Sequence, residues 1–125
     1  MPSMKILLIA GGWSSEREVS LTGACGMQEA LVRRGHAVTF FDLLEHFDDL
    51  LETAPQHDFA LINLHGSPGE DGLVQAMLEK ADCPYQGSGP SGSFLALNKA
   101  AAKQIFRMAG LPTADWEFLP VRPAA

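Results

Sequence analysis

The strongest constraint on the fold is that short apolar segments alternate with helical segments along the first 90 residues. Three segments, Lys5–Ala10, Ala37–Asp42 and Phe59–Leu64, are almost continuously apolar. Apolar runs of this length are typical of strands that are covered on both faces. Strands that alternate with helices predict an open, mainly parallel sheet with right-handed crossovers and helices on both faces. We therefore expect an α/β fold of about four strands, with Cys83–Gln86 as a short fourth strand.

The first helix is predicted between the first two strands. There Ala24, Met27 and Leu31 recur at the spacing of one helix face. Gly23 and Gly26 lie inside this segment, where each glycine costs about 1 kcal/mol relative to alanine. We therefore expect both glycines to lie against a neighbouring strand or helix, because close packing would offset that cost.

Further elements are predicted from helix caps and from the spacing of apolar residues. The last of them, Ala114–Phe118, alternates apolar with acidic residues and predicts a half-buried strand, which suggests a chain that continues into further structure. The preceding elements are a short acidic helix over His46–Glu52, a helix from about Val74 to Ala81 capped by Asp71, and a helix capped by Ser91 or Ser93 that continues to Ala109.

Charge and hydropathy argue against several classes of function. The 125 residues carry a net charge of −6 without a basic cluster, which argues against a nucleic acid partner. No apolar run approaches the roughly 20 residues needed to span a bilayer, and the N-terminus lacks the shape of a signal peptide. Cys25 and Cys83 have no metal-ligand spacing and are typical of reduced thiols. We therefore expect a cytoplasmic protein without a membrane partner.

The loop after the first strand, Gly11–Ser15, is glycine-rich but differs from a dinucleotide-binding fingerprint. Glu16 and Glu18 follow it in the first helical turn. A helix N-terminus attracts anions, but two carboxylates there would repel a phosphate. A ligand with an ammonium group fits better, with Glu16 as its partner. The alternative is that both glutamates only stabilise the helix dipole.

The loop after the third strand, Leu64–Gly72, contains His65 at the position where open α/β sheets bind ligands. His65 either contacts a ligand or is a hydrogen-bonded structural histidine. Lys99 and Lys103 share one helix face, which indicates either a phosphate contact or a solvated surface. The remaining histidines do not cluster, so a histidine metal site is unsupported.

Several motifs in order along the chain resemble those of D-alanine–D-alanine ligases. Residues 11–21 (GGWSSEREVSL) resemble the first motif of that family, and residues 64–72 (LHGSPGEDG) resemble the second. Residues 84–89, 98–99 and 109–113 resemble the stretch that leads into the ATP-grasp portion. The resemblance covers the whole chain, and its first two motifs together are highly specific.

This resemblance implies an activity and roles for individual residues. Such ligases use ATP and magnesium to phosphorylate the carboxylate of a first D-alanine, and the amine of a second D-alanine then attacks the acyl phosphate. By resemblance, Glu16 and His65 are catalytic and bind the first D-alanine, Val19 and Gly66 contact it, and Lys99 binds ATP. The resemblance places most ligands of ATP and of Mg²⁺ (or Mn²⁺) outside this chain and no metal ligand within it.

The resemblance also implies a domain division and an assembly. Residues 1–90 would form an N-terminal Rossmann-like, pre-ATP-grasp substrate domain. Residues 91–125 would lead into a missing ATP-grasp central domain, so this chain alone is expected to be inactive. The complete enzyme would be a homodimer. A stand-alone flavodoxin-like binding module, or a ligase relative that uses D-lactate or D-serine as second substrate, are the alternatives.

Overall fold

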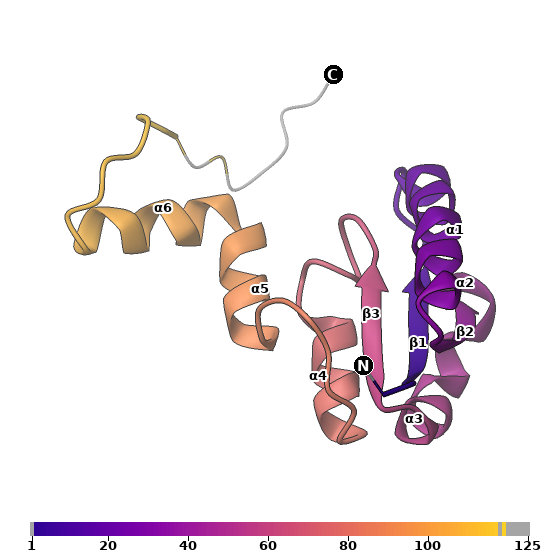
Figure 1. The fold of residues 1–125 in the computed structure, drawn as a ribbon. Helices are drawn as coiled ribbons and strands as arrows, with labels where there is room; N and C mark the ends of the chain where they lie inside the picture. The colour runs from indigo at the N-terminus through magenta and orange to yellow at the C-terminus, as the bar shows by residue number, and fades with distance from the viewer. Residues whose placement is uncertain (1, 118, 120–125) are drawn as a thin grey trace.

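The computed structural model describes residues 2–117 and 119, and its centre is a parallel β-sheet (Figure 1). The three strands of this sheet lie in the order β2-β1-β3. Ile9 in the central strand lies opposite Phe41 on one side and Ile62 on the other. The carboxyl ends of the strands therefore meet at one edge. The strands are β1 (Lys5–Ala10), β2 (Ala37–Asp42) and β3 (Phe59–Asn63).

Helices cover both faces of the sheet, which confirms the expected open parallel α/β fold. The long helix α1 contacts all three strands on one face, and α3 and α4 pack against the other face. α5 contacts α4, and α6 follows α5 away from the sheet (Figure 1). The helices are α1 (Arg17–Arg33), α2 (Leu43–His46), α3 (Leu50–Thr53), α4 (Leu73–Lys80), α5 (Pro90–Leu97) and α6 (Lys99–Met108), with 3₁₀ turns η1 (Phe47–Asp49) and η2 (Ala54–Gln56).

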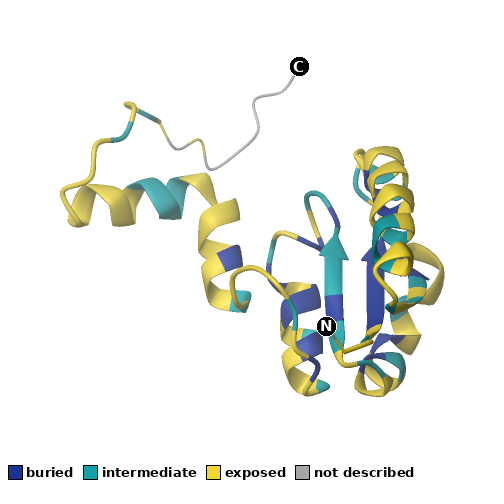
Figure 2. Cartoon of the chain, viewed as in Figure 1, coloured by how far each residue is buried: buried dark blue, intermediate teal, exposed yellow. Residues whose placement is uncertain are grey.

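The side chains of β1 divide between two hydrophobic clusters because successive strand residues point to opposite faces. Leu7 packs in a cluster with Leu50 of α3 and Leu78 of α4. Leu8 points to the other face and packs with Ala24 of α1. All five side chains are fully buried, and burying each leucine stabilises the fold by about 1.5–3 kcal/mol. The core therefore lies on both faces of β1, whose ribbon is coloured as buried in Figure 2.

Two strand predictions were wrong within the described residues. The segment Cys83–Gln86 contributes only an isolated parallel bridge between Ala60 and Tyr85, not a fourth strand. Residues 114–117 form no strand, and Phe118 lies outside the described residues. Lys103 Nζ donates hydrogen bonds to Thr113 Oγ1 at 3.1 Å and to the Ala114 carbonyl oxygen at 3.0 Å. These bonds hold the segment beside α6, where the described chain offers it no strand to pair with.

The acidic helix expected over His46–Glu52 begins earlier and is divided. The Asp42 carboxylate accepts a hydrogen bond from the Leu44 N–H at 3.1 Å, so α2 begins directly after β2. The chain then continues as α3 after a 3₁₀ turn. Helix α4 (Leu73–Lys80) begins and ends one residue before the expected positions, and Gly72 rather than Asp71 occupies its N-cap. Asp71 instead accepts a hydrogen bond from Leu73 N–H at 3.0 Å.

The single helix expected from Ser91 to Ala109 is two helices. Asn98 has a non-helical backbone (φ −79°, ψ 89°), and its side chain accepts a hydrogen bond from Ala101 N–H at 3.1 Å. Asparagine favours such a cap over a helix interior, so the helix breaks there. The N-cap of α5 is Gly89, which corrects the expectation of a cap at Ser91 or Ser93.

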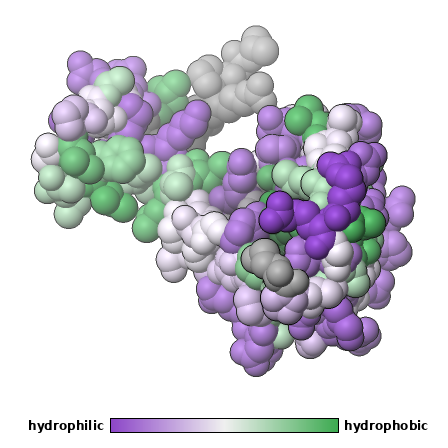
Figure 3. Space-filling view, viewed as in Figure 1, coloured by the Kyte–Doolittle hydropathy of each residue, from purple (hydrophilic) through white to green (hydrophobic). Residues whose placement is uncertain are grey.

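The helix pair α5 and α6 exposes apolar surface (Figure 3). Its exposed large apolar side chains include Phe94, Leu97, Ile105, Phe106 and Met108, the last with 80% of its surface accessible. Monomeric proteins seldom leave large contiguous apolar areas uncovered. This pair therefore contrasts with the sheet, whose apolar residues are covered by helices.

Candidate functional site

Two loops leave the carboxyl edge of the sheet and touch one another. The first loop (residues 11–16) joins β1 to α1, and the second loop (residues 64–72) joins β3 to α4. A Cβ placed on Gly66 would lie 3.4 Å from Ser14 Cβ, and one placed on Gly12 would lie 3.3 Å from Leu64 Cδ2. The loops therefore form one continuous surface at the position where open α/β sheets bind ligands.

The first loop turns sharply because it begins with two glycines in the left-handed region. The φ angles are 78° at Gly11 and 75° at Gly12, which side chains with a Cβ rarely adopt. A Cβ on Gly11 would collide with Arg17 Nη1 and would lie 2.6 Å from Asp42 Oδ1. Glycine at this position therefore lets an ion pair lie directly across the backbone of the loop.

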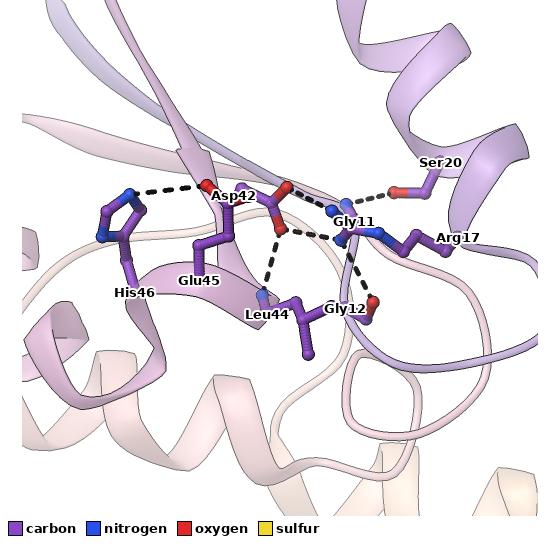
Figure 4. A network of polar contacts seen from close by, with 8 residues as sticks. All are labelled: Gly11, Gly12, Arg17, Ser20, Asp42, Leu44, Glu45 and His46. Atoms are coloured by element: carbon purple, nitrogen blue, oxygen red, sulfur yellow. Dashed lines mark hydrogen bonds and ion pairs between the residues drawn. The ribbon is translucent and has the colours of Figure 1, made fainter.

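That ion pair joins the start of α1 to the end of β2 (Figure 4). Arg17 Nη1 lies 2.8 Å from Asp42 Oδ1, and Arg17 Nη2 lies 2.6 Å from Asp42 Oδ2. Arg17 Nη1 also donates to the Gly12 carbonyl oxygen at 3.2 Å. The hydrogen bonds from Arg17 hold the pKa of Asp42 below its usual value, and those same bonds raise the pKa of Arg17. The pair is thus ionised and anchors the first loop to β2.

A second polar contact joins α1 to the ends of β1 and β3. Ser20 is fully buried, and its Oγ accepts a hydrogen bond from Gly11 N–H at 2.8 Å. Ser20 Oγ donates to the Asn63 carbonyl oxygen, and Asn63 Nδ2 donates to the Ser20 carbonyl oxygen at 2.7 Å. The first turns of α1 are therefore tied to the residue that precedes the second loop.

Sequence reasoning missed four residues of these two contacts, namely Arg17, Ser20, Asp42 and Asn63. It gave none of the four a role of its own, although Arg17 and Ser20 lie within the motif of residues 11–21 and Asp42 ends a predicted strand. A usable signal was present, because Asp42 and Asn63 both end strands of a parallel sheet. Residues in that position meet at one edge of the sheet.

The second loop is held by its own polar side chains. Gly66 N–H donates to Glu70 Oε2 at 2.8 Å, while Glu70 N–H donates to the Gly66 carbonyl oxygen at 2.7 Å. Gln75 Nε2 in α4 donates to the Gly69 carbonyl oxygen at 2.6 Å. Glu70 therefore stabilises the loop that carries His65.

The structure places four of the expected site residues on the two loops or beside them. Glu16 is exposed at the N-cap of α1, and its carboxylate accepts no capping hydrogen bond from the helix. Val19, in the first turn of α1, is 62% exposed. His65 and Gly66 lie half-buried in the second loop. Lys99 is not brought to this edge, because it is the exposed first residue of α6.

The described residues offer no metal centre. Within residues 2–117 and 119, no group of three or more histidine, cysteine, aspartate or glutamate side chains is placed to hold a metal ion. None of the helices in this part of the chain is both long and apolar enough to cross a membrane.

The fold defines an open, parallel-sheet α/β domain, and its two contiguous loops lie at the edge where such domains bind ligands. No protein-family model matches the chain. The D-alanine–D-alanine ligase of Desulfovibrio desulfuricans is 76% identical over 120 residues, which cover 96% of this chain and 39% of that protein. The D-alanine–D-alanine ligase of Nitratidesulfovibrio vulgaris strain Hildenborough is 69% identical over 122 residues. The chain therefore belongs to the D-alanine–D-alanine ligase family, of which it represents the N-terminal part.

Solved structures agree with this assignment. The crystal structure of the Bacillus anthracis D-alanine–D-alanine ligase complexed with ATP has a TM-score of 0.85 and 37% sequence identity to this chain. That similarity covers 98% of this chain and 42% of the Bacillus protein. This chain thus spans about two fifths of the length of the relatives that it matches. The family resemblance read from the sequence motifs is confirmed.

Proposed function

We propose that this chain is the N-terminal substrate domain of an ATP-dependent D-alanine–D-alanine ligase, which joins two D-alanines for peptidoglycan synthesis. The 76% identity over nearly the whole chain to such a ligase supports this function. In this proposal residues 1–90 form the substrate domain and residues 91–125 lead into an ATP-grasp central domain. The exposed apolar side chains of α5 and α6 support that division, because the remaining protein would cover them.

The proposed role of Glu16 is to bind the ammonium of the first D-alanine. The observation that carries this role is an exposed carboxylate at the edge where the two loops meet, free of any capping hydrogen bond. Such a carboxylate attracts an ammonium and repels a phosphate. His65 acts with Glu16 in catalysis, and Val19 and Gly66 complete the contacts with the substrate.

ATP would supply the phosphoryl group that activates the carboxylate of the first D-alanine. Lys99 is exposed at the first position of α6, so its ammonium is accessible to a phosphate. Lys103, one turn later, instead donates hydrogen bonds to Thr113 and to Ala114. Lys99 is therefore the better fit for an ATP contact. By resemblance to the family, most ligands of ATP and of Mg²⁺ would come from the rest of the enzyme.

The remaining features of the proposal concern the whole enzyme. It would be a homodimer in the cytoplasm and would have no nucleic acid or membrane partner. The net charge of −6 argues against a nucleic acid partner, because nucleic acid binding requires clustered positive charge. Its second substrate is proposed to be D-alanine, as in the related ligases.

The test is the substitution Glu16→Gln in the complete enzyme, which keeps the shape of the side chain and removes its charge. A charge-assisted hydrogen bond is worth roughly 1.5–3 kcal/mol, so the specificity constant for the first D-alanine should fall about 10- to 150-fold. The measurement is steady-state formation of D-alanyl-D-alanine at varied D-alanine concentration.

Glu18→Gln is the matched control. Glu18 is exposed in the first turn of α1, as Glu16 is at its N-cap, and it carries the same charge toward the helix dipole. Because no ligand role is proposed for Glu18, its substitution should leave the kinetics unchanged. Equal losses of the specificity constant in the two variants would show that the glutamates act through helix electrostatics and not through substrate binding.

A further inference from the structure

We propose that Ser20 and Asn63 are positioning residues that hold the two substrate loops in a fixed relation to one another. This inference rests on the proposed function, because it concerns the same D-alanine site. Neither residue is proposed to touch the substrate. They act instead through Glu16 in the first loop and His65 in the second loop.

The hydroxyl of Ser20 is suited to this task because it both accepts and donates. It accepts from Gly11 N–H, at the end of β1, and donates to the Asn63 carbonyl oxygen, at the end of β3. Both Ser20 and Gly11 are buried, so water cannot replace a lost hydrogen-bond partner unless the surrounding residues move. Alanine at position 20 would leave a buried N–H and a carbonyl unsatisfied, which is more costly than losing an exposed hydrogen bond.

Asn63 closes the contact from the other side. Its Nδ2 donates to the Ser20 carbonyl oxygen at 2.7 Å, so the two residues exchange hydrogen bonds in both directions. Gly23, one turn further along α1, leaves room for this amide: a Cβ there would lie 3.0 Å from Asn63 Nδ2. The absence of a side chain at position 23 thus permits α1 to approach the end of β3.

The contact lies close in the chain to both proposed substrate residues. Ser20 N–H donates to the Glu16 carbonyl oxygen at 3.1 Å, so Ser20 is one helical turn after Glu16. Asn63 precedes His65 by two residues. A shift of α1 relative to β3 would therefore move the Glu16 carboxylate relative to the His65 ring.

The Arg17–Asp42 pair anchors the same part of α1 but joins different elements. It ties α1 and the first loop to β2, on the opposite side of β1 from β3. The Ser20–Asn63 contact instead ties α1 to the strand that leads into the second loop. Loss of the latter contact should therefore disturb the relation between the two loops, even while the first loop stays anchored to β2.

The test uses the complete enzyme with the substitutions Ser20→Ala and Asn63→Asp. A displacement of about 1 Å in a positioned group reduces rates by roughly 100-fold, so we expect the specificity constant for the first D-alanine to fall about 10- to 100-fold. The KM for ATP should not change, because the contact is not near Lys99. Asn63→Asp keeps the size of the side chain but replaces the amide donor by a charged carboxylate oxygen, which cannot donate to the Ser20 carbonyl oxygen. It therefore breaks the contact and carries the test if Ser20→Ala does not fold.

A double-mutant cycle separates positioning from a general loss of stability. In the Ser20→Ala background the Glu16 carboxylate is displaced, so Glu16→Gln should reduce the specificity constant less than about threefold, instead of tenfold or more. If Ser20→Ala does not fold, the same cycle is run in the Asn63→Asp background. Leu50→Val is the control: Leu50 is fully buried in α3 on the other face of the sheet. It should lower stability and leave the effect of Glu16→Gln unchanged.

The outcomes separate this inference from the function on which it rests. A wild-type enzyme that forms no D-alanyl-D-alanine would refute the proposed function. An active wild type, with folded Ser20→Ala or Asn63→Asp variants that keep its specificity constant, would refute the positioning role alone. A full effect of Glu16→Gln in either background would refute it as well.

Discussion

The two glycines inside α1 provide the sharpest test of packing. Both were expected to lie against a neighbour, but the structure distinguishes them. At Gly26 no described atom outside the local helix backbone lies within 4 Å of an added Cβ, which shows that the expectation was wrong there. At Gly23 the added Cβ lies 3.0 Å from Asn63 Nδ2, as the expectation of a close neighbour required.

We therefore predict different effects on stability for alanine at the two positions. Gly26→Ala should raise the free energy of unfolding by about 0.5–1 kcal/mol, because alanine restricts the unfolded chain and favours the helix. For a chain of this length that corresponds to a rise in Tm of roughly 2–4 °C. Gly23→Ala gains the same helix propensity but displaces the Asn63 amide from its 2.7 Å hydrogen bond. Since that bond is worth about 0.5–1.5 kcal/mol, the net change should be near zero or destabilising.

The assay is urea unfolding at pH 7, followed by far-ultraviolet circular dichroism, on the wild type and both variants. The urea midpoint of Gly26→Ala should lie above that of the wild type, and the midpoint of Gly23→Ala should lie at or below it. A destabilised Gly26→Ala variant would show that α1 meets a neighbour at that position. Equal stabilisation by both substitutions would show that Asn63 yields without cost and that the contact with α1 is loose.

Three further predictions concern an ion pair, the two thiols and the activity of the chain by itself. The folded-state pKa of Asp42 lies below its unfolded-state value of about 3.9. The ionised carboxylate therefore stabilises the fold fully above that value, and this stabilisation is lost as pH falls through the folded-state pKa. In urea titrations, the difference in unfolding free energy between wild type and Asp42→Asn should be constant from pH 7 to about 5 and should shrink below pH 4. Burial raises the pKa of the Cys83 thiol and shields it, whereas Cys25 is exposed, so a thiol reagent should modify Cys25 in the folded chain and Cys83 only in denaturant. The 125-residue chain by itself should form no D-alanyl-D-alanine from ATP and D-alanine, and detectable ATP-dependent synthesis would contradict its assignment as a substrate domain.

The sequence by itself determined the three strands of the sheet, helices α1 and α4, and the family. An apolar run as short as Lys5–Ala10 favours a buried strand over a helix, because a sheet covered on both faces buries nearly every side chain along it. The motifs in residues 11–21 and 64–72 likewise depend on local order along the chain. The positions of Glu16 and His65 on two loops at one edge follow from the parallel arrangement of those strands.

Only the tertiary structure decided which side chains hold those loops. Arg17 meets Asp42 across 25 residues, and Ser20 meets Asn63 across 43. Such contacts depend on the register of neighbouring strands and on the rotation of α1 about its axis, neither of which leaves a periodic signal. The same reason explains why the strand prediction at Cys83–Gln86 was wrong. A strand there requires a partner along its whole length, and the fold provides one bridge. Local pattern thus specified the elements, whereas pairing between distant residues set the geometry of the site.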